Sequence, residues 1–397
     1  MKYSILRIRT RINYLYNIEH MEIKKMKVLT VIGTRPEIIK LSEVIKELDR
    51  KTDHILVHTG QNYDYELNEI FFKELGLRKP DYFLEAVGAT AAATVGKIIE
   101  KVDEVLEKEK PEALLILGDT NSALGAYAAK RLKIPIFHME AGNRCFDARV
   151  PEEVNRKILD HLCDINLVYS DVTRLNLLNE GLPMDRILKT GSPTYEVLLA
   201  HKKEIEASPV LEELSLTPGE YFVLSAHREE NINIDENFKK LIEIIRRVSD
   251  TYDKTIIFSV HPRTRKRLES EHIELPKNVV MMKPLGLLAY DKLQMHALCV
   301  ITDSGTISEE SSMLNFPGVN IREAHERVEA MDEGSVIMTG LNPDRVLQAI
   351  ELARTQSRGT DREFRLPPDY SYTNVSKKVV RIIMSYTDYV NRHVWMK

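Results

Sequence analysis

The sequence has few cysteines, no long apolar run and no excess of positive charge, and each absence excludes a class of protein. Its 397 residues include three cysteines, too few for a disulfide framework and without the paired spacing of a zinc site. We therefore expect a reducing, cytoplasmic compartment. No apolar stretch approaches the ~18 residues that a membrane-spanning helix requires. The formal net charge of −4 provides no positive field to attract nucleic acid.

The length and composition indicate a globular chain of roughly two domains. A chain of 397 residues exceeds the ~250–300 at which a single core stops growing. Hydrophobic residues at 43% and charged residues at 29% exclude disorder and low complexity. Residues 1–26 carry six Lys and Arg side chains and lack the apolar core of a signal peptide. We interpret them as a basic extension ahead of the first core strand, with Met21 or Met26 as an alternative start.

Short runs rich in Val, Ile and Leu alternate with amphipathic stretches, which predicts parallel strands linked by helices and an α/β fold. One series of expected strands covers residues 28–32, 55–58, 113–117, 134–138 and 165–169, with helices at 36–48, 94–107 and 152–162. A second series covers residues 221–225, 255–260, 279–282, 299–302 and 318–321. We therefore expect two doubly wound domains, 27–200 and 201–373, with a hinge within 192–219. A terminal helix within 374–397 is expected to cross back to the first domain.

The first expected strand leads directly into a helix through residues 33–37 (GTRPE). Gly33 permits a tight turn there, and the free N–H groups of the helix start favour an anion beside Arg35 and Lys40. The segment matches neither the G-x-G-x-x-G dinucleotide fingerprint nor the Walker loop. The sequence thus predicts a diphosphate site, with a plain helix start as the alternative.

Acidic residues follow neighbouring strands of the first domain. Asp119 comes after residues 113–117, and Glu140 comes after residues 134–138. Ligands of parallel sheets bind at the carboxyl ends of the strands, so both side chains are candidates for general acid/base catalysis, although either could instead cap a helix. Glu152 and Glu153 begin the next helix, and either could face the cleft or complement the helix dipole.

The second domain contributes a histidine and a possible phosphate loop. His227 and Arg228 directly follow a strand, and His227 could protonate a leaving phosphate or be structural. The backbone of residues 304–306 could hold phosphate, and Glu310 could bind ribose hydroxyls. A nucleotide-sugar between the domains would satisfy both anion sites. No sequence-local spacing indicates a metal.

Six motifs in order resemble the non-hydrolysing UDP-N-acetylglucosamine 2-epimerases of the two-domain GT-B fold, from Lys27 to about Met384. The resemblance implies a UDP-sugar substrate, a homodimer, diphosphate contacts from Arg35, Lys40 and His227, and proton transfer by Asp119, Glu140 and Glu152, with His227 also in the catalytic set. The other residues matching the family's substrate-binding positions are Arg156, Arg228, Leu285, Tyr290, Ser304, Gly305, Thr306, Glu310 and Arg322.

The chemistry favours elimination of UDP to 2-acetamidoglucal followed by re-addition, because the C2 hydrogen has no adjacent carbonyl. We expect no NAD and no metal cofactor. The product would supply N-acetylmannosamine-type precursors for surface polysaccharide or glycan synthesis. Departures from the family at Asn143, Cys145 and Thr306 resemble the branch that epimerises UDP-2,3-diacetamido-2,3-dideoxyglucuronate. Gln61 matches part of the activator-binding turn of bacterial relatives, but Asp64 does not.

The sequence alone leaves three further alternatives open. A GT-B glycosyltransferase would share the UDP-binding domain but needs no base at C2. A non-catalytic UDP-sugar-binding protein would not need the acidic groups and His227 together. A hydrolysing epimerase would release free N-acetylmannosamine.

Overall fold

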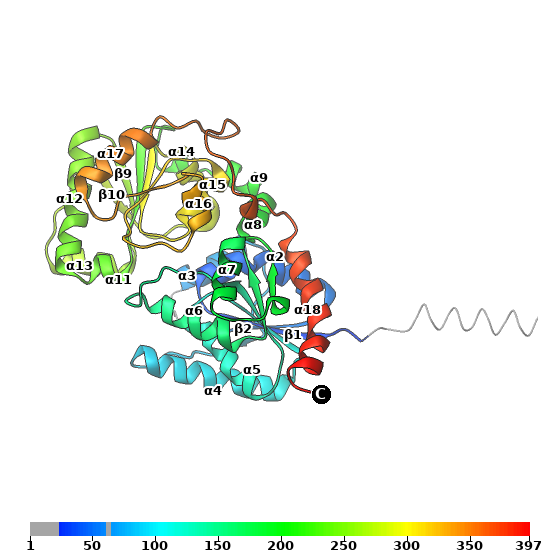
Figure 1. Cartoon of the computed structure of the whole chain (residues 1–397). Coiled ribbons are helices and arrows are strands. Elements are labelled where there is room, and N and C mark those ends of the chain that lie inside the picture. The colour runs from blue at the N-terminus through cyan, green and yellow to red at the C-terminus, as the bar shows by residue number, and fades with distance from the viewer. Residues whose placement is uncertain (1–23, 61–64) are drawn as a thin grey trace, which may run out of the picture.

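Two α/β units make up the computed structural model, which describes residues 24–60 and 65–397 (Figure 1). Most of the N-terminal extension, together with Gln61 and Asp64, lies outside the described residues. Within the described part, the first unit has a seven-stranded parallel sheet in the order β3-β2-β1-β4-β5-β6-β7. The second has a six-stranded parallel sheet in the order β10-β9-β8-β11-β12-β13. The α/β class and the GT-B arrangement expected from the sequence are confirmed.

The first unit alternates strands and helices along the chain. Its strands are β1 (Lys27–Ile32), β2 (Asp53–His58), β3 (Tyr82–Phe83), β4 (Ala113–Leu117), β5 (Ile136–Ala141), β6 (Ile165–Val168) and β7 (Ile187–Lys189). Its helices are α2 (Arg35–Lys51), α3 (Tyr65–Glu74), α4 (Ala91–Glu109), η1 (Asn121–Gly125), α5 (Ala126–Arg131), α6 (Pro151–Leu162), α7 (Asp171–Asn179) and η2 (Met184–Arg186).

The second unit follows three short connecting helices and has the same alternation. The connection contains α8 (Thr194–Ala200), α9 (Lys202–Ala207) and α10 (Val210–Glu213). The strands are β8 (Tyr221–Ser225), β9 (Thr255–Ser259), β10 (Val279–Met282), β11 (Cys299–Thr302), β12 (Gly318–Asn320) and β13 (Ile337–Met338). The helices are α11 (Glu229–Ile232), α12 (Asp235–Tyr252), α13 (Pro262–Ser270), α14 (Leu287–His296), α15 (Ile307–Leu314), α16 (Val328–Asp332), α17 (Pro343–Ala353), η3 (Pro368–Tyr370) and α18 (Val375–His393).

The cores explain why the strands read as continuous apolar runs. Every residue of β4 is buried, and its alternate side chains enter two different clusters. Leu115 packs toward α2 and α18, whereas Leu114 and Ile116 pack toward α4 and α5. A sheet covered on both faces has no solvent side, so the strand shows no polar alternation. The carboxyl end of β4 is therefore held in place by packed cores on both faces of the sheet.

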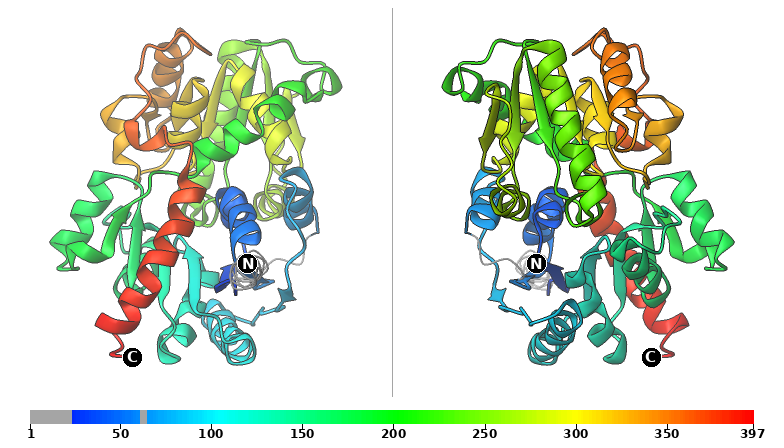
Figure 2. Two further views of the ribbon diagram at one scale, coloured as in Figure 1. Left: turned by 90° about the vertical axis from the view of Figure 1, so that its right-hand side faces the viewer. Right: turned by 90° about the vertical axis from the view of Figure 1, so that its left-hand side faces the viewer.

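The terminal helix α18 packs against α2 of the first unit (Figures 1 and 2). Its buried Val375, Val379 and Ile383 recur every four residues and join the first unit's core. The backbone N–H of Ser192 donates to the carbonyl of Asp369 over 3.0 Å, so the two segments that pass between the units are bonded together. Both chain crossings between the units thus lie together, where a hinge can operate.

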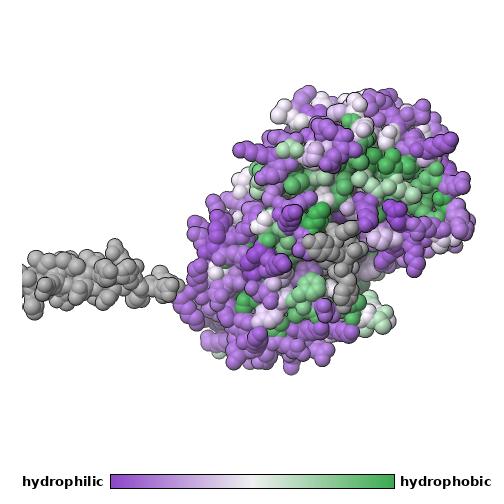
Figure 3. Space-filling model, turned by 180° about the vertical axis from the view of Figure 1, so that it is seen from behind, coloured by the Kyte–Doolittle hydropathy of each residue, from purple (hydrophilic) through white to green (hydrophobic). Residues whose placement is uncertain are grey.

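The short edge strands β3, β7 and β13, of two or three residues each, were not expected from the sequence. Segments this short leave no periodic pattern to detect. Seen from behind, the surface is mostly hydrophilic, with hydrophobic residues gathered on the second unit (Figure 3). None of the helices in the described ranges combines the length and apolarity that a membrane crossing demands.

Candidate functional site

Candidate site residues from the two domains contact each other between the two sheets. Glu152 of the first domain lies 3.4 Å from Arg228 of the second. Lys40 of the first domain lies 3.5 Å from Glu309 of the second. These contacts join side chains that follow the carboxyl ends of strands in both sheets, which is where parallel sheets bind ligands.

The start of α2 is fixed by Glu37 from within the helix. Its Oε2 accepts hydrogen bonds from the N–H groups of Gly33 and Thr34, at 3.0 and 2.8 Å, and Oε1 accepts from Thr120 Oγ1 at 2.9 Å. Burial raises the pKa of Glu37 to about 7 although these hydrogen bonds oppose the rise. A Cβ at Gly33 would come within 2.1 Å of the Thr59 hydroxyl, so no larger residue fits. Glu37 therefore ties the loop before Arg35 to the loop that carries Asp119.

Glu140 lies inside β5, and the expectation that it follows the strand is wrong. The pairing of β5 with β6 shifts register between Met139 and Ala141, and Glu140 has a φ of 62°. Such a bulge re-aims one side chain within a strand, and a positive φ is uncommon for a residue other than glycine. Sequence patterns do not report bulges, so residues 134–138 ended the expected strand too early.

The Glu140 carboxylate is held between cations from both domains. Its Oε2 accepts hydrogen bonds from Lys40 Nζ at 2.6 Å and Tyr169 Oη at 3.1 Å, and its Oε1 accepts from Arg327. Burial by itself would raise the pKa of Glu140, but Lys40 and Arg327 outweigh it and hold the pKa well below the usual range. Glu140 is therefore ionised at neutral pH.

Asp119 follows β4 and faces the opposite pKa balance. Its Oδ2 accepts from Arg156 Nη2 at 2.7 Å and Nε at 3.1 Å. Burial raises the pKa of Asp119, and the charges of Glu140 and Glu152 add to the rise, although Arg156 opposes it.

The two acidic residues at the start of α6 have different environments. Glu153 is buried, accepts N–H bonds from Cys145 and Phe146, and pairs with Arg156 at 3.1 Å. Glu152 keeps a side chain that is 39% exposed and reaches Arg228. Glu153 is thus held by its own domain, whereas Glu152 is the one that contacts the second domain.

His227 is oriented by Asp303 at the end of β11. Asp303 Oδ1 lies 3.1 Å from His227 Nδ1, and the carboxylate also accepts the N–H groups of His227 and Arg228. Burial would raise the pKa of Asp303, but the His227 imidazole and these hydrogen bonds hold it below its usual value. With Nδ1 engaged, Nε2 is the ring nitrogen available to a ligand.

The loop of residues 304–306 lies beside an arginine cluster. A Cβ at Gly305 would come within 2.8 Å of Glu326 Oε1 and 3.2 Å of Arg322 Nη1. Burial would raise the pKa of Glu326, but Arg322 and further arginines lower it to about 2. The N–H groups of Ser304 and Thr306 donate hydrogen bonds within the loop, to Thr302 Oγ1 and Ser304 Oγ. A phosphate would therefore compete with these acceptors for the two N–H groups.

Three of the residues expected to bind the substrate, Leu285, Tyr290 and Glu310, lie on or next to α14. Tyr290 Oη donates to Ser225 Oγ over 3.2 Å, and burial raises the pKa of Tyr290 to about 12. Leu285 packs with Tyr290 against the second domain's core. Glu310 Oε2 accepts from Gln294 Nε2 at 3.1 Å. Burial also raises the pKa of Glu310, and the charge of Arg35 opposes the rise at both Tyr290 and Glu310.

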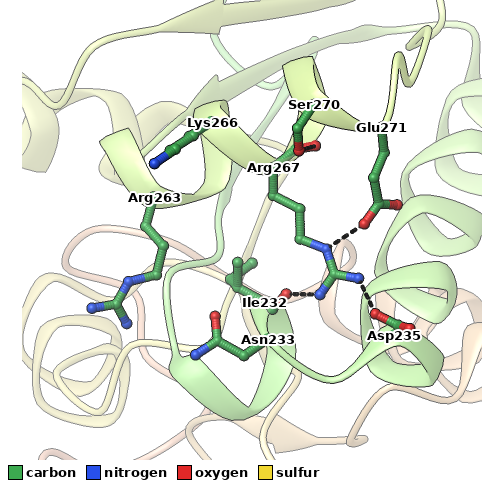
Figure 4. A pocket seen from close by; sticks show the side chains of 8 residues that line it. All are labelled: Ile232, Asn233, Asp235, Arg263, Lys266, Arg267, Ser270 and Glu271. Atoms are coloured by element: carbon green, nitrogen blue, oxygen red, sulfur yellow. Dashed lines mark hydrogen bonds and ion pairs between the residues drawn. The ribbon is translucent and has the colours of Figure 1, made fainter.

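A separate pocket of about 490 Å³ lies between α11 and α13 (Figure 4). Its Arg267 donates to Asp235 and Glu271, which neutralise it. The pocket contains none of the site residues expected from the sequence. Among the residues that the structure describes, no group of three or more His, Cys, Asp or Glu side chains is arranged as a metal site.

Sequence reasoning did not select Tyr169, Glu309 or Arg327 as site residues. Glu309 neighbours the selected Glu310, but successive helical residues point about 100° apart, so only Glu309 reaches Lys40. Arg327 lies in a loop before α16, where no local pattern signals a contact with Glu140. Their roles depend on the approach of one domain to the other.

His138 lies on β5 and contacts the loop that precedes Asp119. Its Nε2 bonds the carbonyl of Gly118 at 2.8 Å, and Nδ1 lies 3.1 Å from Asp160 Oδ1. Asp160 also accepts from the N–H of Gly142 and from Arg144. Burial opposes protonation, but Asp160 and the Gly118 carbonyl raise the pKa of His138 above its ordinary value.

We expect His138→Phe to lower the free energy of unfolding by about 3–5 kcal/mol, because it removes one partner of a buried ion pair. A raised folded-state pKa gives stability that is fully present below the unfolded value of ~6.5 and is lost as the pH rises through the folded value. Urea unfolding should thus show a larger gap between wild type and variant at pH 6 than at pH 9. The exposed His161→Phe is the control and should change stability by less than about 1 kcal/mol. A gap that widens at alkaline pH would contradict the assignment.

Comparisons with known proteins identify the family of the chain. The UDP-N-acetylglucosamine 2-epimerase family model matches residues 46–384. The structure is similar to that of UDP-N-acetylglucosamine 2-epimerase from Rickettsia bellii, with 52% identity, a TM-score of 0.88 and coverage of 94% of this chain and 100% of that one. It is also similar to the Methanocaldococcus jannaschii UDP-GlcNAc 2-epimerase in complex with UDP-GlcNAc and UDP, with 34% identity, a TM-score of 0.85 and coverage of 91% and 100%.

A third relative has a different sugar in its name. The UDP-2,3-diacetamido-2,3-dideoxy-D-glucuronate 2-epimerase of Pseudomonas aeruginosa is 35% identical over 83% of this chain and 92% of its own. Both names describe inversion at C2 of a UDP-sugar. Given the extent of the family match and of these likenesses, the chain belongs to the UDP-N-acetylglucosamine 2-epimerase family, a family of isomerases.

Proposed function

We propose that the protein interconverts UDP-N-acetylglucosamine and UDP-N-acetylmannosamine by eliminating UDP and adding it back. The observation that carries the proposal is the meeting of carboxylates and cations from the two domains, in which Glu140 pairs with Arg327 and Glu152 pairs with Arg228. The complex of the Methanocaldococcus jannaschii relative with UDP-GlcNAc and UDP supports the choice of substrate.

The elimination divides a difficult inversion into two proton transfers. In the first, the C2–H bond breaks and a carboxylate takes the proton, while the bonding electrons form a C1–C2 double bond. The C1–O bond breaks at the same time, and UDP leaves with its electron pair. In the reverse sense, C2 receives a proton on the opposite face and a UDP oxygen rejoins C1. Two acid/base groups, one for each face, are the minimum requirement.

The environments of the carboxylates support this division of roles. The pKa of Asp119 is raised and that of Glu140 is lowered, so Asp119 holds a proton more readily than Glu140 does. Sites that push the pKa values of two neighbouring groups apart are typical of acid/base pairs. We therefore propose Glu140 as the acceptor and Asp119 as the donor in one direction of the reaction, with the roles exchanged in the other.

The proposed role of the basic residues is to stabilise the departing diphosphate. Arg35 from the first domain and Arg228, Arg322 and His227 from the second approach the same cleft. Cationic groups near a leaving diphosphate stabilise the charge that develops as the C1–O bond breaks. The proposed chemistry requires no NAD, because it forms no ketone at C3, and the cations that it needs at the diphosphate are supplied by the chain's own side chains.

UDP-2,3-diacetamido-2,3-dideoxyglucuronate is the second candidate substrate. It is favoured by the 35% identity to the Pseudomonas aeruginosa enzyme and by the family departures at Asn143, Cys145 and Thr306. The same elimination applies to that sugar, so the choice concerns only the groups at C3 and C6. The supply of precursors for polysaccharide synthesis, the homodimer and the cytoplasmic location remain predictions.

The test is incubation of the purified protein with each UDP-sugar separately, without added NAD or metal, followed by proton NMR of the sugar. Appearance of UDP-N-acetylmannosamine from UDP-N-acetylglucosamine supports the proposal. Conversion of the diacetamido-uronate alone favours the second candidate. Release of free N-acetylmannosamine indicates a hydrolysing enzyme, and no change in either sugar contradicts both candidates.

We expect His227→Asn to lower kcat by about 100-fold, because the variant cannot protonate or pair with the leaving phosphate. Its stability should be close to that of wild type, since the His227 side chain is 36% exposed. Phosphorus NMR of UDP formation gives the rate of the elimination step. The exposed His393→Asn on α18 is the control and should retain the wild-type rate. Unchanged UDP formation in His227→Asn would remove His227 from the mechanism.

A further inference from the structure

Four buried charges from the two domains form a closed ring around the site. Lys40 contacts Glu140 at 2.6 Å and Glu309 at 3.5 Å. Arg327 contacts Glu309 at 3.4 Å and also pairs with Glu140. Positive and negative corners thus alternate, and each charge has two partners of opposite sign. Lys40 and Glu140 come from the first domain, and Glu309 and Arg327 come from the second.

All four side chains of the ring are buried, with exposed fractions between 0% and 12%, so the ring is part of the interior rather than a set of surface ion pairs. The Tyr169 hydroxyl donates to Glu140 Oε2, and both cations lie over the Tyr169 ring, with Lys40 Nζ and the Arg327 guanidinium carbon 5.9 and 5.7 Å from its centroid. Buried charges are costly unless every one of them is paired, and this arrangement pairs all of them.

Glu309 attaches the ring to the segment that joins the domains. Its Oε1 accepts from the hydroxyls of Ser192, between β7 and α8, and of Thr194, the first residue of α8. Its Oε2 faces Lys40 and Arg327. Glu309 therefore connects Lys40 and Arg327 to the chain segment that joins the two units.

Each oxygen of Glu140 has a different source of restraint. Oε2 is held from the first domain by Lys40 and Tyr169, whereas Oε1 is held from the second domain by Arg327. A carboxylate clamped at both oxygens keeps one orientation, which general acid/base catalysis requires. Without Arg327, Oε1 would keep only a long bond from Asn143 at 3.4 Å.

We propose that Arg327 is a positioning residue that keeps Glu140 ionised and aimed, and that Glu309 holds Arg327 in place for this role. The role in turnover rests on the proposed function, but the effect on Glu140 does not. Because Arg327 belongs to the second domain, Glu140 is in this state only while the two domains are in contact through the ring.

The other groups that face Glu140 set the sign of the expected changes. Lys40 on α2 favours the ionised form, whereas Asp119 beyond β4 and Glu309 on α15 oppose it. The Tyr169 hydroxyl is neutral and donates to it. Removing Arg327 should therefore raise the proton affinity of Glu140, and neutralising Glu309 should not raise it.

The experiment is a pH titration of protein labelled with carbon-13 at the glutamate carboxyl carbon. The Glu140 signal is identified as the one missing from Glu140→Gln. In wild type it should stay in its ionised position to the lowest pH at which the protein is folded. In Arg327→Met it should titrate at least about one pH unit higher, a tenfold change in proton affinity. Arg327→Lys should restore most of the difference, and Glu309→Gln should not shift the titration upward.

A purely structural role for Arg327 gives a different result. It would lower stability in Arg327→Met without moving the Glu140 titration, and that outcome overturns the proposal. An upward shift in Glu309→Gln also overturns it, because electrostatics predicts the opposite sign. The exposed Arg365→Met, which removes a surface pair with Glu333, is the matched control and should leave the titration unchanged.

Kinetics separate this proposal from the proposed function. If wild type epimerises, Arg327→Met should lower kcat at least about tenfold with a smaller change in KM, because the residue acts through Glu140. If wild type does not epimerise, the proposed function is wrong, but the titration still tests whether Arg327 keeps Glu140 ionised. If wild type epimerises and Arg327→Met keeps both the wild-type titration and the wild-type kcat, the proposed function stands. The proposed role of Arg327 is then wrong.

Discussion

Glu140→Gln should lower the rate of C2 inversion by about 10³-fold or more, the largest effect we expect from one substitution. The amide keeps the shape, and its single oxygen can accept from either Lys40 or Arg327 but not from both, and it cannot take the C2 proton. The side chain lies among cations rather than on the diphosphate residues of the second domain, so UDP affinity should change little. The rate is followed by NMR of the sugar, and the affinity by calorimetry with UDP.

The control for this substitution is Glu112→Gln at the far end of the sheet. Glu112 accepts the N–H of Lys27 at the start of β1, opposite the carboxyl ends of the strands. Its substitution should leave turnover at the wild-type rate. Near-normal inversion by Glu140→Gln would remove Glu140 from the proton-transfer step, whatever the control shows.

Asp119→Asn should lower turnover by about 10²–10⁴-fold, the range for loss of a general acid or base. The new amide oxygen can still accept from Arg156, so the loop after β4 should keep its position. Burial and the charges of Glu140 and Glu152 raise the pKa of Asp119, so its titration should appear above the ordinary ~3.9. In the direction in which Asp119 accepts the proton, the acid limb that it contributes to the pH profile of kcat/KM in wild type should be absent from the residual activity of the variant.

Asp53→Asn serves as the comparison for Asp119. Asp53 is an exposed residue of β2 that lies 3.9 Å from Lys27, on the edge of the molecule away from the cleft. Its rate and pH profile should match those of wild type. A variant Asp119→Asn that retains both the rate and the acid limb would show that another group carries this proton.

The sequence was sufficient to place most of the candidate site because parallel sheets put their strand ends at one edge. Asp119 follows β4 and His227 follows β8, and the hydrophobic runs that reveal those strands also locate both residues. Arg35 could be placed in the same way, from the glycine turn after β1 and the proline that begins α2. This reasoning depends only on local pattern and on one rule of topology.

The details that the sequence did not reveal depend on tertiary contacts. The bulge at Glu140 depends on how β5 pairs with β6, and no residue type in that stretch requires it. The difference between Glu152 and Glu153 appears only when α6 is placed against the loop after β5. Arg327 joins the site through the approach of the second domain, across 187 residues of sequence.

The most direct test of the central claim is the reaction in deuterated water, with UDP-N-acetylglucosamine as substrate and no added NAD or metal. Elimination and re-addition transfer the C2 proton to carboxylates that exchange with solvent. The account therefore predicts UDP-N-acetylmannosamine with deuterium at C2, together with loss of label incorporation in Glu140→Gln. Epimerised product that retains the original hydrogen at C2 would contradict proton transfer at that carbon and the proposed roles of Asp119 and Glu140.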